Sequence, residues 1–240
     1  MIKSAINRIL ELSVPNVIEQ NGRKYVDKNM NELDPPCYAK PLEVHTLSAL
    51  MDYIRSGADK WSMKTGRFVL HVEDFNQVHL YRELDDRKKR DHLLSASSFP
   101  CAFPFGRWME LEHFIIQLQT SFVATEALEE LASLAGNIVS QAEVSQKDDG
   151  ITQQVTVKDG ISLVRQKAVK NPVLLRTYRT FTDVEQPEST FVFRLKKQDS
   201  GITAALFSAD GEEWKRQCIL GIREYFSKQL SEKDNTILLA

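Results

Sequence analysis

Basic and aromatic side chains are concentrated between residues 171 and 197, where they could recognise an anionic surface. Five of them are candidate binding residues: Arg176, Tyr178, Arg179, Arg194 and Lys196. Lys197 could belong to the same basic surface. Guanidinium and ammonium groups beside one aromatic ring suit single-stranded nucleic acid or an acidic partner protein. The alternative is that Tyr178 and Arg179 brace the acidic loop that follows them through ion pairs.

Carboxylates recur at the ends of the expected strands, and clustered carboxylates can hold two magnesium ions for phosphodiester cleavage. The set consists of Asp148, Asp149, Asp183, Glu185, Glu188 and Asp210. Each stands where Asp or Glu commonly forms a turn or a helix cap, and no lysine is placed as in a nuclease motif. A metal-dependent nuclease is therefore only the residual catalytic hypothesis.

The usual sequence signatures of enzymes are missing. The chain has no phosphate-binding loop, no dinucleotide-binding glycine motif, no Gly-x-Ser-x-Gly elbow and no zinc-deaminase signature. Cys37, Cys101 and Cys218 are widely spaced, which favours neither a disulfide scaffold nor a zinc knuckle. We therefore predict a protein that is not an enzyme and has no catalytic residues and no cofactor.

Two further segments invite a chemical interpretation. His71 and His79 lie opposite each other if residues 68–80 form a hairpin, and they could begin a metal site, although no third ligand is evident. Residues 82–92 are highly charged, but acidic residues nearly neutralise the basic ones, so a solvated segment is expected. Residues 99–106 contain three phenylalanines that could stack bases, although such a loop more often plugs a core.

The elements that must position these residues follow from hydrophobic periodicity. Residues 151–158 and 161–167 flank the hairpin signal Asp159-Gly160, and residues 173–181, 190–197 and 202–208 read as further strands. Apolar positions after Asp210, an expected N-cap, predict a C-terminal helix. The C-terminal half is thus expected to be an antiparallel sheet of about five strands with this helix packed on it.

The N-terminal half is expected to combine helices with a β-hairpin. A first helix should end at Pro15, followed by a short strand and an extended arm. A second helix should run from Thr46 to Gly57, before the hairpin of residues 68–80. Apolar spacing predicts a long central helix over residues 107–135, with Thr120-Ser121 as the favoured bend.

Together these elements predict the α+β class, with three parts. Residues 1–43 would form the N-terminal helix and arm, and residues 44–136 the second helix, the hairpin and the central helix. Residues 137–240 would form the sheet and the C-terminal helix, either separately or continuous with 44–136.

The chain also resembles a known family in its central region. Residues 171–194 fit the pattern Asn-Pro-Val-x-Leu-x-x-Tyr-Arg-Thr-Phe-x-x-Val-x-Gln-Pro-x-Ser-x-Phe-x-x-Arg, with Asp-Gly-Ile-Thr-Gln at 149–153 and Ala-Asp-Gly-x-x-Trp at 209–214. This pattern resembles the YfdQ-like family of phage and prophage proteins, from about residue 44 to the C-terminal helix. The resemblance implies a temperate-phage gene and a cytoplasmic protein in a bacterial host, and it implies no activity.

Amino-acid composition further limits the kinds of protein that this chain could be. An apolar content of 42% supports a real core, and a formal charge of −2 disfavours general coating of nucleic acid. No signal-peptide pattern or membrane-length apolar run occurs. We predict a non-catalytic accessory protein that self-assembles and binds a host or phage protein to modulate host machinery or defence. The alternatives are a single-stranded nucleic-acid-binding accessory of replication or recombination, and the metal-dependent nuclease.

Overall fold

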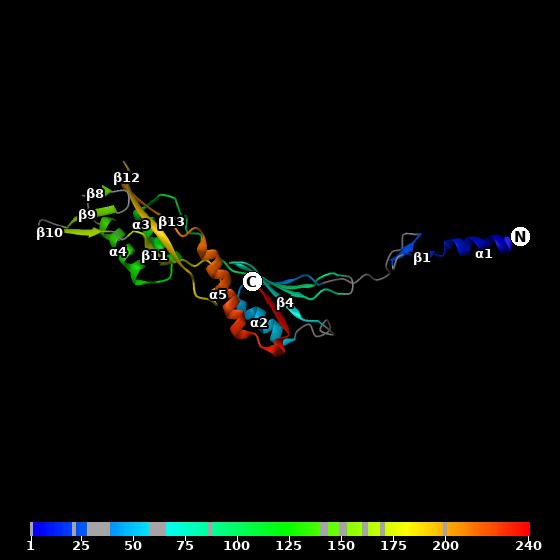
Figure 1. Ribbon diagram of the computed structural model, residues 1–240. Coiled ribbons are helices and arrows are strands. Elements are labelled where there is room, and N and C mark those ends of the chain that lie inside the picture. Colours follow the sequence, from blue (N-terminus) through cyan, green and yellow to red (C-terminus); the bar gives the residue numbers. More distant parts are fainter. Residues whose placement is uncertain are drawn as a thin grey trace. The chain divides into compact units, whose positions relative to one another are not determined.

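The computed structural model describes residues 2–20, 23–27, 39–57, 66–85, 88–139, 144–148, 153–159, 163–168, 171–198 and 201–240 (Figure 1). Backbone contacts divide the chain into two units, Met1–Tyr38 and Ala39–Ala240. Helices combine with antiparallel and mixed sheets, so the expected α+β class is confirmed.

The first unit contains a helix followed by a β-hairpin. Helix α1 covers Ile2–Ser13 and ends before Pro15, as predicted. Strands β1 (Val17–Gln20) and β2 (Arg23–Val26) pair antiparallel, which confirms a short strand in this region. The predicted arm falls mostly on residues 28–38, which lie outside the described residues.

A five-stranded sheet forms one half of the second unit. In spatial order its strands are β14 (Thr236–Leu239), β4 (Phe68–Asp74), β5 (Gln77–Arg82), β6 (His92–Ser97) and β3 (Leu42–Val44). The three central strands are antiparallel, whereas β14 joins β4 and β3 joins β6 in parallel. The predicted hairpin of residues 68–80 is therefore confirmed as β4 and β5.

Helix α2 (Leu47–Ser56) confirms the predicted helix between Thr46 and Gly57. The Thr46 hydroxyl oxygen accepts a hydrogen bond from the Ala49 N–H (3.3 Å), as an N-cap should. Gly57 ends the helix in the left-handed region (φ 61°), where a side chain would add strain. The buried face of α2 packs into the core of the five-stranded sheet through Leu47, Leu50, Met51 and Ile54.

A four-stranded sheet forms the other half. Its order is β11 (Val173–Arg176), β12 (Glu188–Gln198), β13 (Gly201–Ser208) and β7 (Met109–Glu110), all antiparallel. The predicted alternation in β12 is confirmed: Phe191, Phe193 and Leu195 are buried, while Arg194 and Lys196 occupy the opposite face.

The predicted central helix is divided at its favoured bend, because two helices occupy this region. Helix α3 covers Leu111–Ser121 and α4 covers Glu126–Val139. The break follows the favoured bend: Phe122 is extended and forms a β-bridge with Thr177, so the chain joins the edge of the sheet there. The apolar stripe continues across the break because both helices bury it in the same core, and periodicity alone could not detect the interruption.

The single antiparallel sheet of about five strands is also corrected. The strands of the C-terminal half are antiparallel, but β8 (Val144–Asp148), β9 (Gln153–Asp159) and β10 (Leu163–Ala168) form a separate three-stranded sheet. The predicted hairpin of β9 and β10 is present, with Asp159 opposite Leu163, and its connecting residues 160–162 lie outside the described residues.

The C-terminal helix α5 (Glu213–Gln229) packs elsewhere than expected. Its buried Ile222 and Phe226 enter the core of the five-stranded sheet, whereas we predicted packing on the sheet of the C-terminal half. A contact between segments far apart in the sequence explains this packing. After a short 3₁₀ turn (Glu232–Asp234), the chain continues as β14, which pairs with β4 of the five-stranded sheet. Asp210 is not the N-cap; Glu212 is, and the Asp210 carboxylate accepts the Glu212 N–H (3.2 Å).

Candidate functional site

Arg179 is an internal side chain, not part of a basic surface. It is 5% exposed, and its guanidinium lies over three aromatic rings, at 4.3 Å from Trp214, 4.9 Å from Phe105 and 5.3 Å from Phe191. It donates hydrogen bonds to the hydroxyl oxygens of Ser189 (3.1 Å) and Ser208 (3.4 Å). Burial lowers the pKa of this guanidinium, against the opposing effect of the Asp210 carboxylate. Arg179 thereby links the four-stranded sheet to the start of α5.

Arg176 is the residue that braces the acidic loop. Its guanidinium forms an ion pair with Glu185 and lies 3.8 Å from the Glu188 carboxylate. The alternative interpretation of this region assigned that role to Tyr178 and Arg179. The amide of Gln186 also holds the loop, because its oxygen accepts the backbone N–H groups of Arg179 (2.8 Å) and Thr180 (3.2 Å).

The remaining three candidates lie closer to solvent. Tyr178 is 40% exposed, while its backbone carbonyl accepts the Cys101 N–H (2.7 Å). Lys196 is exposed and Arg194 is partly exposed, both on the outer face of β12. Register places Arg176 on that same face, opposite Glu188. The structure thus brings Arg176, Arg194 and Lys196 to one side of the sheet, with the charge of Arg176 compensated by carboxylates.

Asp183 caps a helix that is far from it in sequence. Its two carboxylate oxygens accept the backbone N–H groups of Leu47 and Ser48, each at 3.1 Å, at the first turn of α2. Neighbouring Phe181 is buried in the core of the five-stranded sheet. The acidic loop therefore joins the two halves of the second unit. Sequence reasoning assigned Asp183 to a turn or cap, but no local motif could reveal its partner.

The other carboxylates do not converge on a metal. Glu185 and Glu188 flank Arg176, and Asp210 contacts a backbone N–H. Asp148 lies on β8, and Asp149 is outside the described residues. Within the described ranges, no three His, Cys, Asp or Glu side chains group closely enough to hold a metal ion.

A hydrogen-bonded histidine network lies on the five-stranded sheet. His71 is opposite His79, as the expected hairpin register requires. The His79 ring contacts the Glu73 carboxylate (Nε2 to Oε2, 2.6 Å) and the Ser95 hydroxyl (Nδ1 to Oγ, 3.1 Å), and Ser95 also contacts His92 (Oγ to Nε2, 3.0 Å). Burial, followed by the effect of His79, lowers the pKa of His92. Sequence reasoning missed Ser95 and His92.

This network can hold and pass a proton, but its setting does not suit nucleophilic catalysis. A carboxylate, an imidazole and a hydroxyl in sequence resemble the connectivity that activates a serine. Ser95 lies inside β6, however, between β5 and β3, where backbone N–H groups belong to the sheet ladder. Strand amides so used do not form an oxyanion hole.

The phenylalanine loop mostly fills a core. Phe103 is 5% exposed and contacts Phe122 edge-to-face, and Phe105 stacks on Phe191 at 5.2 Å. Phe99 is exposed and lies 4.3 Å from the His45 ring. The expectation that this loop plugs a core accounts for two of its three rings.

Apolar side chains of the first unit are exposed to solvent. On α1 the exposed fraction is 80% at Ile2, 50% at Ile6 and 67% at Ile9. On the hairpin, Val17 and Ile18 are more than 60% exposed. The first unit therefore does not bury these apolar side chains itself.

Comparison with family models, curated proteins and solved structures finds no match for this chain. Among the described residues, none of the helices is both long and apolar enough to span a membrane.

Proposed function

We propose that the chain is a non-catalytic accessory protein that self-assembles and binds a macromolecular partner. By its resemblance to the YfdQ-like family, it would be encoded by a phage or prophage and act in the cytoplasm of the bacterial host. Its partner would be a host or phage protein, and its effect would be to modulate host machinery or defence.

The observation that carries this proposal is the exposure of the first unit. A helix and a two-stranded hairpin are too small to bury their own apolar surface, and a lone hairpin is marginally stable in water. The apolar face of α1 recurs at Ile2, Ile6 and Ile9, the spacing of one helix face. Burial of this face requires another surface.

The charge pattern of the first unit favours a protein surface, specifically a second copy of the chain. The sequence of α1 contains two basic residues, Lys3 and Arg8, and one acidic residue, Glu11, which is fewer cations than a helix that binds anionic lipid or nucleic acid usually carries. Most soluble oligomers are built from identical chains. A second copy is always available at the same place and time.

Native mass spectrometry of the full chain, purified from its host with minimal washing, tests the proposal. We expect a multiple of the 27.4 kDa chain, with an additional protein mass that identifies the partner. A bare monomer would contradict self-assembly. A heterogeneous nucleic-acid mass would replace the proposal with the single-strand-binding alternative, centred on Arg194 and Lys196.

A further inference from the structure

The five-stranded sheet has an inner face that packs on helices and an outer face that does not share that core. Leu70 and Leu80 point inward, into the cluster that includes α2 and α5. Alternation places Val69 and Tyr81, which are paired across β4 and β5, on the outer face. A cavity of about 460 Å³ lies over the β14 end of this outer face, lined by Val69, Glu83, Leu84, Arg90, Ile237 and Leu239.

The floor of the cavity is apolar and fixed by strand pairing. Ile237 is the partner of Val69 in the parallel β14–β4 ladder, and Val69 is only 5% exposed. Leu84 and Leu239 form the sides and are about half-exposed, at 56% and 47%. Apolar surface left open in this way gains free energy when an apolar group covers it.

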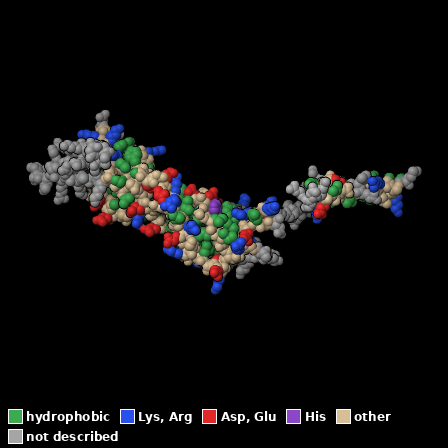
Figure 2. All heavy atoms as spheres, in the orientation of Figure 1, with side chains coloured by type: hydrophobic (Ala, Val, Ile, Leu, Met, Phe, Trp, Pro, Cys, Tyr) green, Lys and Arg blue, Asp and Glu red, His purple; other side chains and the backbone are tan. Residues whose placement is uncertain are grey.

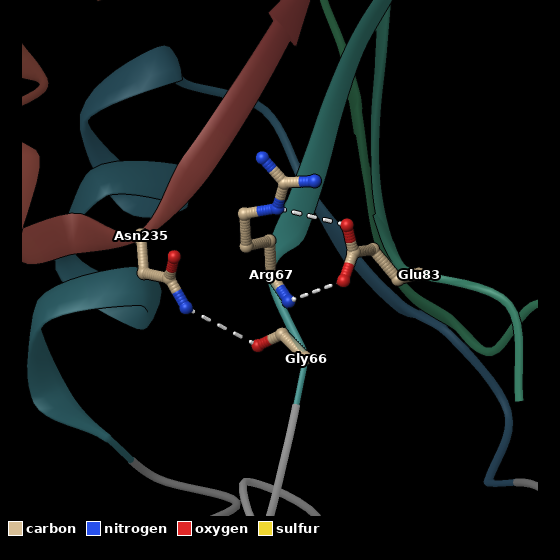
Figure 3. Close-up of polar contacts among 4 residues, drawn as sticks. All are labelled: Gly66, Arg67, Glu83 and Asn235. Carbon is tan, nitrogen blue, oxygen red and sulfur yellow. Dashed lines mark hydrogen bonds and ion pairs between the residues drawn. The ribbon is translucent and has the colours of Figure 1, made fainter.

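Arg67 donates hydrogen bonds to Glu83, the acidic side chain that lines the cavity. Both Glu83 carboxylate oxygens accept hydrogen bonds from Arg67, one from its backbone N–H (3.1 Å) and one from Nε (2.9 Å) (Figure 3). These hydrogen bonds lower the pKa of Glu83. On the other side of this segment, the Asn235 side chain donates to the Gly66 carbonyl (3.4 Å) and ties β14 to the start of β4.

The second charged group of the cavity is Arg90. Its guanidinium lies 5.9 Å from the centre of the Tyr81 ring, and no carboxylate pairs with it in the part of the chain that the structure describes. On the face of the second unit that Figure 2 shows, Lys and Arg side chains lie among hydrophobic side chains and among those of Asp and Glu. At this cavity, a cation without a carboxylate partner among the described residues lies beside an apolar floor, and the nearby Glu83 carboxylate is already hydrogen-bonded to Arg67.

We propose that this cavity binds a small amphipathic anion, with an apolar chain on the floor and a carboxylate head against Arg90. The volume falls within the range of about 300–1,000 Å³ found for small-molecule sites. A guanidinium binds a carboxylate through two parallel N–H···O bonds, so the head group fixes the orientation of the ligand. This site is independent of the self-assembly proposed above.

Octanoate, 1-octanol and acetate separate the contributions of head and chain. We would titrate each into the full-length protein with ¹³C-labelled methyl groups and follow Val69, Ile237 and Leu239 by NMR. Octanoate should shift all three methyl signals with saturation, octanol should shift them more weakly, and acetate should leave them unchanged. Unshifted methyl groups with octanoate, or equal binding of octanol, would overturn the proposal.

Two matched arginine variants test the head-group contact. Arg90→Met keeps an apolar stem and removes the charge, whereas Arg107→Met makes the same change at another exposed position. Octanoate affinity should fall about three- to tenfold in Arg90→Met, as expected for a partly solvated ion pair, with octanol affinity retained. An equal loss in both variants, or none in Arg90→Met, would show that Arg90 does not hold the head group.

Discussion

Arg176 and Arg179 are three positions apart in sequence and lie in opposite environments. Arg179 is enclosed by aromatic rings and bonded to Ser189 and Ser208, whereas Arg176 is partly exposed beside Glu185. Residue type alone could not separate them, since both follow apolar positions in the same strand region. The distinction depends on Trp214 and Phe105, which reach Arg179 from other elements.

Replacing these two arginines should therefore have unequal effects. Arg179→Met removes the stacked cation and leaves two serine hydroxyls without their donor, so we expect a loss of about 1–3 kcal/mol in unfolding free energy. Arg176→Met breaks a solvated pair and should cost less than about 1 kcal/mol. Urea denaturation of both variants measures the difference, and equal losses would contradict the internal role of Arg179.

The buried thiol of Cys218 should make the unfolding free energy of the protein fall at alkaline pH. Burial raises the pKa of its thiol from 9.0 to about 12. Above pH 9 the unfolded chain therefore loses this proton while the folded chain keeps it, so the unfolding free energy must fall as pH rises. The contribution of this one group approaches about 1.4 kcal/mol per pH unit.

Urea denaturation under reducing conditions, at about pH 8 and about pH 10, measures this contribution. The decline should be smaller in Cys218→Ala than in the unchanged chain, because alanine has no proton to lose. The variant has its own packing cost at both pH values, so only the difference between the two declines is informative. Identical declines would exclude the thiol as their source.

At the scale of elements, the first turn of α2 depends on a loop from the other half of the unit. Asp183→Asn removes the negative charge at the helix N-terminus and leaves one oxygen for two N–H groups. We expect a loss of about 1–2 kcal/mol in unfolding free energy and faster hydrogen exchange at Leu47 and Ser48. Asp52→Asn makes the same charge change on an exposed position of α2 and should have little effect.

Local signals predicted the elements well, and non-local pairing limited the rest. Thr46 and Gly57 define α2 because a cap acts within its own turn, and the alternation in β12 follows from one strand. The partner of a strand or helix is chosen by contacts far along the chain, which is why the split into two sheets and the packing of α5 were missed. The Phe122–Thr177 bridge that interrupts the central helix is equally non-local.

In the candidate site, too, local features could be predicted from the sequence and non-local contacts could not. The position of Lys196 on the outer face of β12 follows from strand period, and the opposition of His71 and His79 follows from hairpin length. The hydrogen bonds of Ser95 required knowledge that β6 lies beside β5. The Arg90 cavity required the return of β14, which no pattern near Arg90 encodes.

For the whole molecule, self-assembly through the first unit predicts a clear response to charge on α1. Ile6→Asp combined with Ile9→Asp places two carboxylates on the exposed apolar face and should convert the oligomer to monomer, because burial of unpaired charge is unfavourable. Light scattering after size-exclusion chromatography reports the mass. Asn7→Asp adds a charge away from the centre of that face and should leave the oligomer intact; monomers in both variants would point to general charge sensitivity instead.

The parallel pairing of β14 with β4 also has a consequence for the order of synthesis. The ribosome makes β4 well before its partner at 236–239, because the two strands are far apart along the chain. At a synthesis rate of roughly 5–20 residues per second, the edge of β4 stays unpaired for on the order of ten seconds before β14 is made. During that interval the nascent sheet has an open edge that can pair with a neighbouring chain. The border of the Arg90 cavity can therefore form only after β14 has been made.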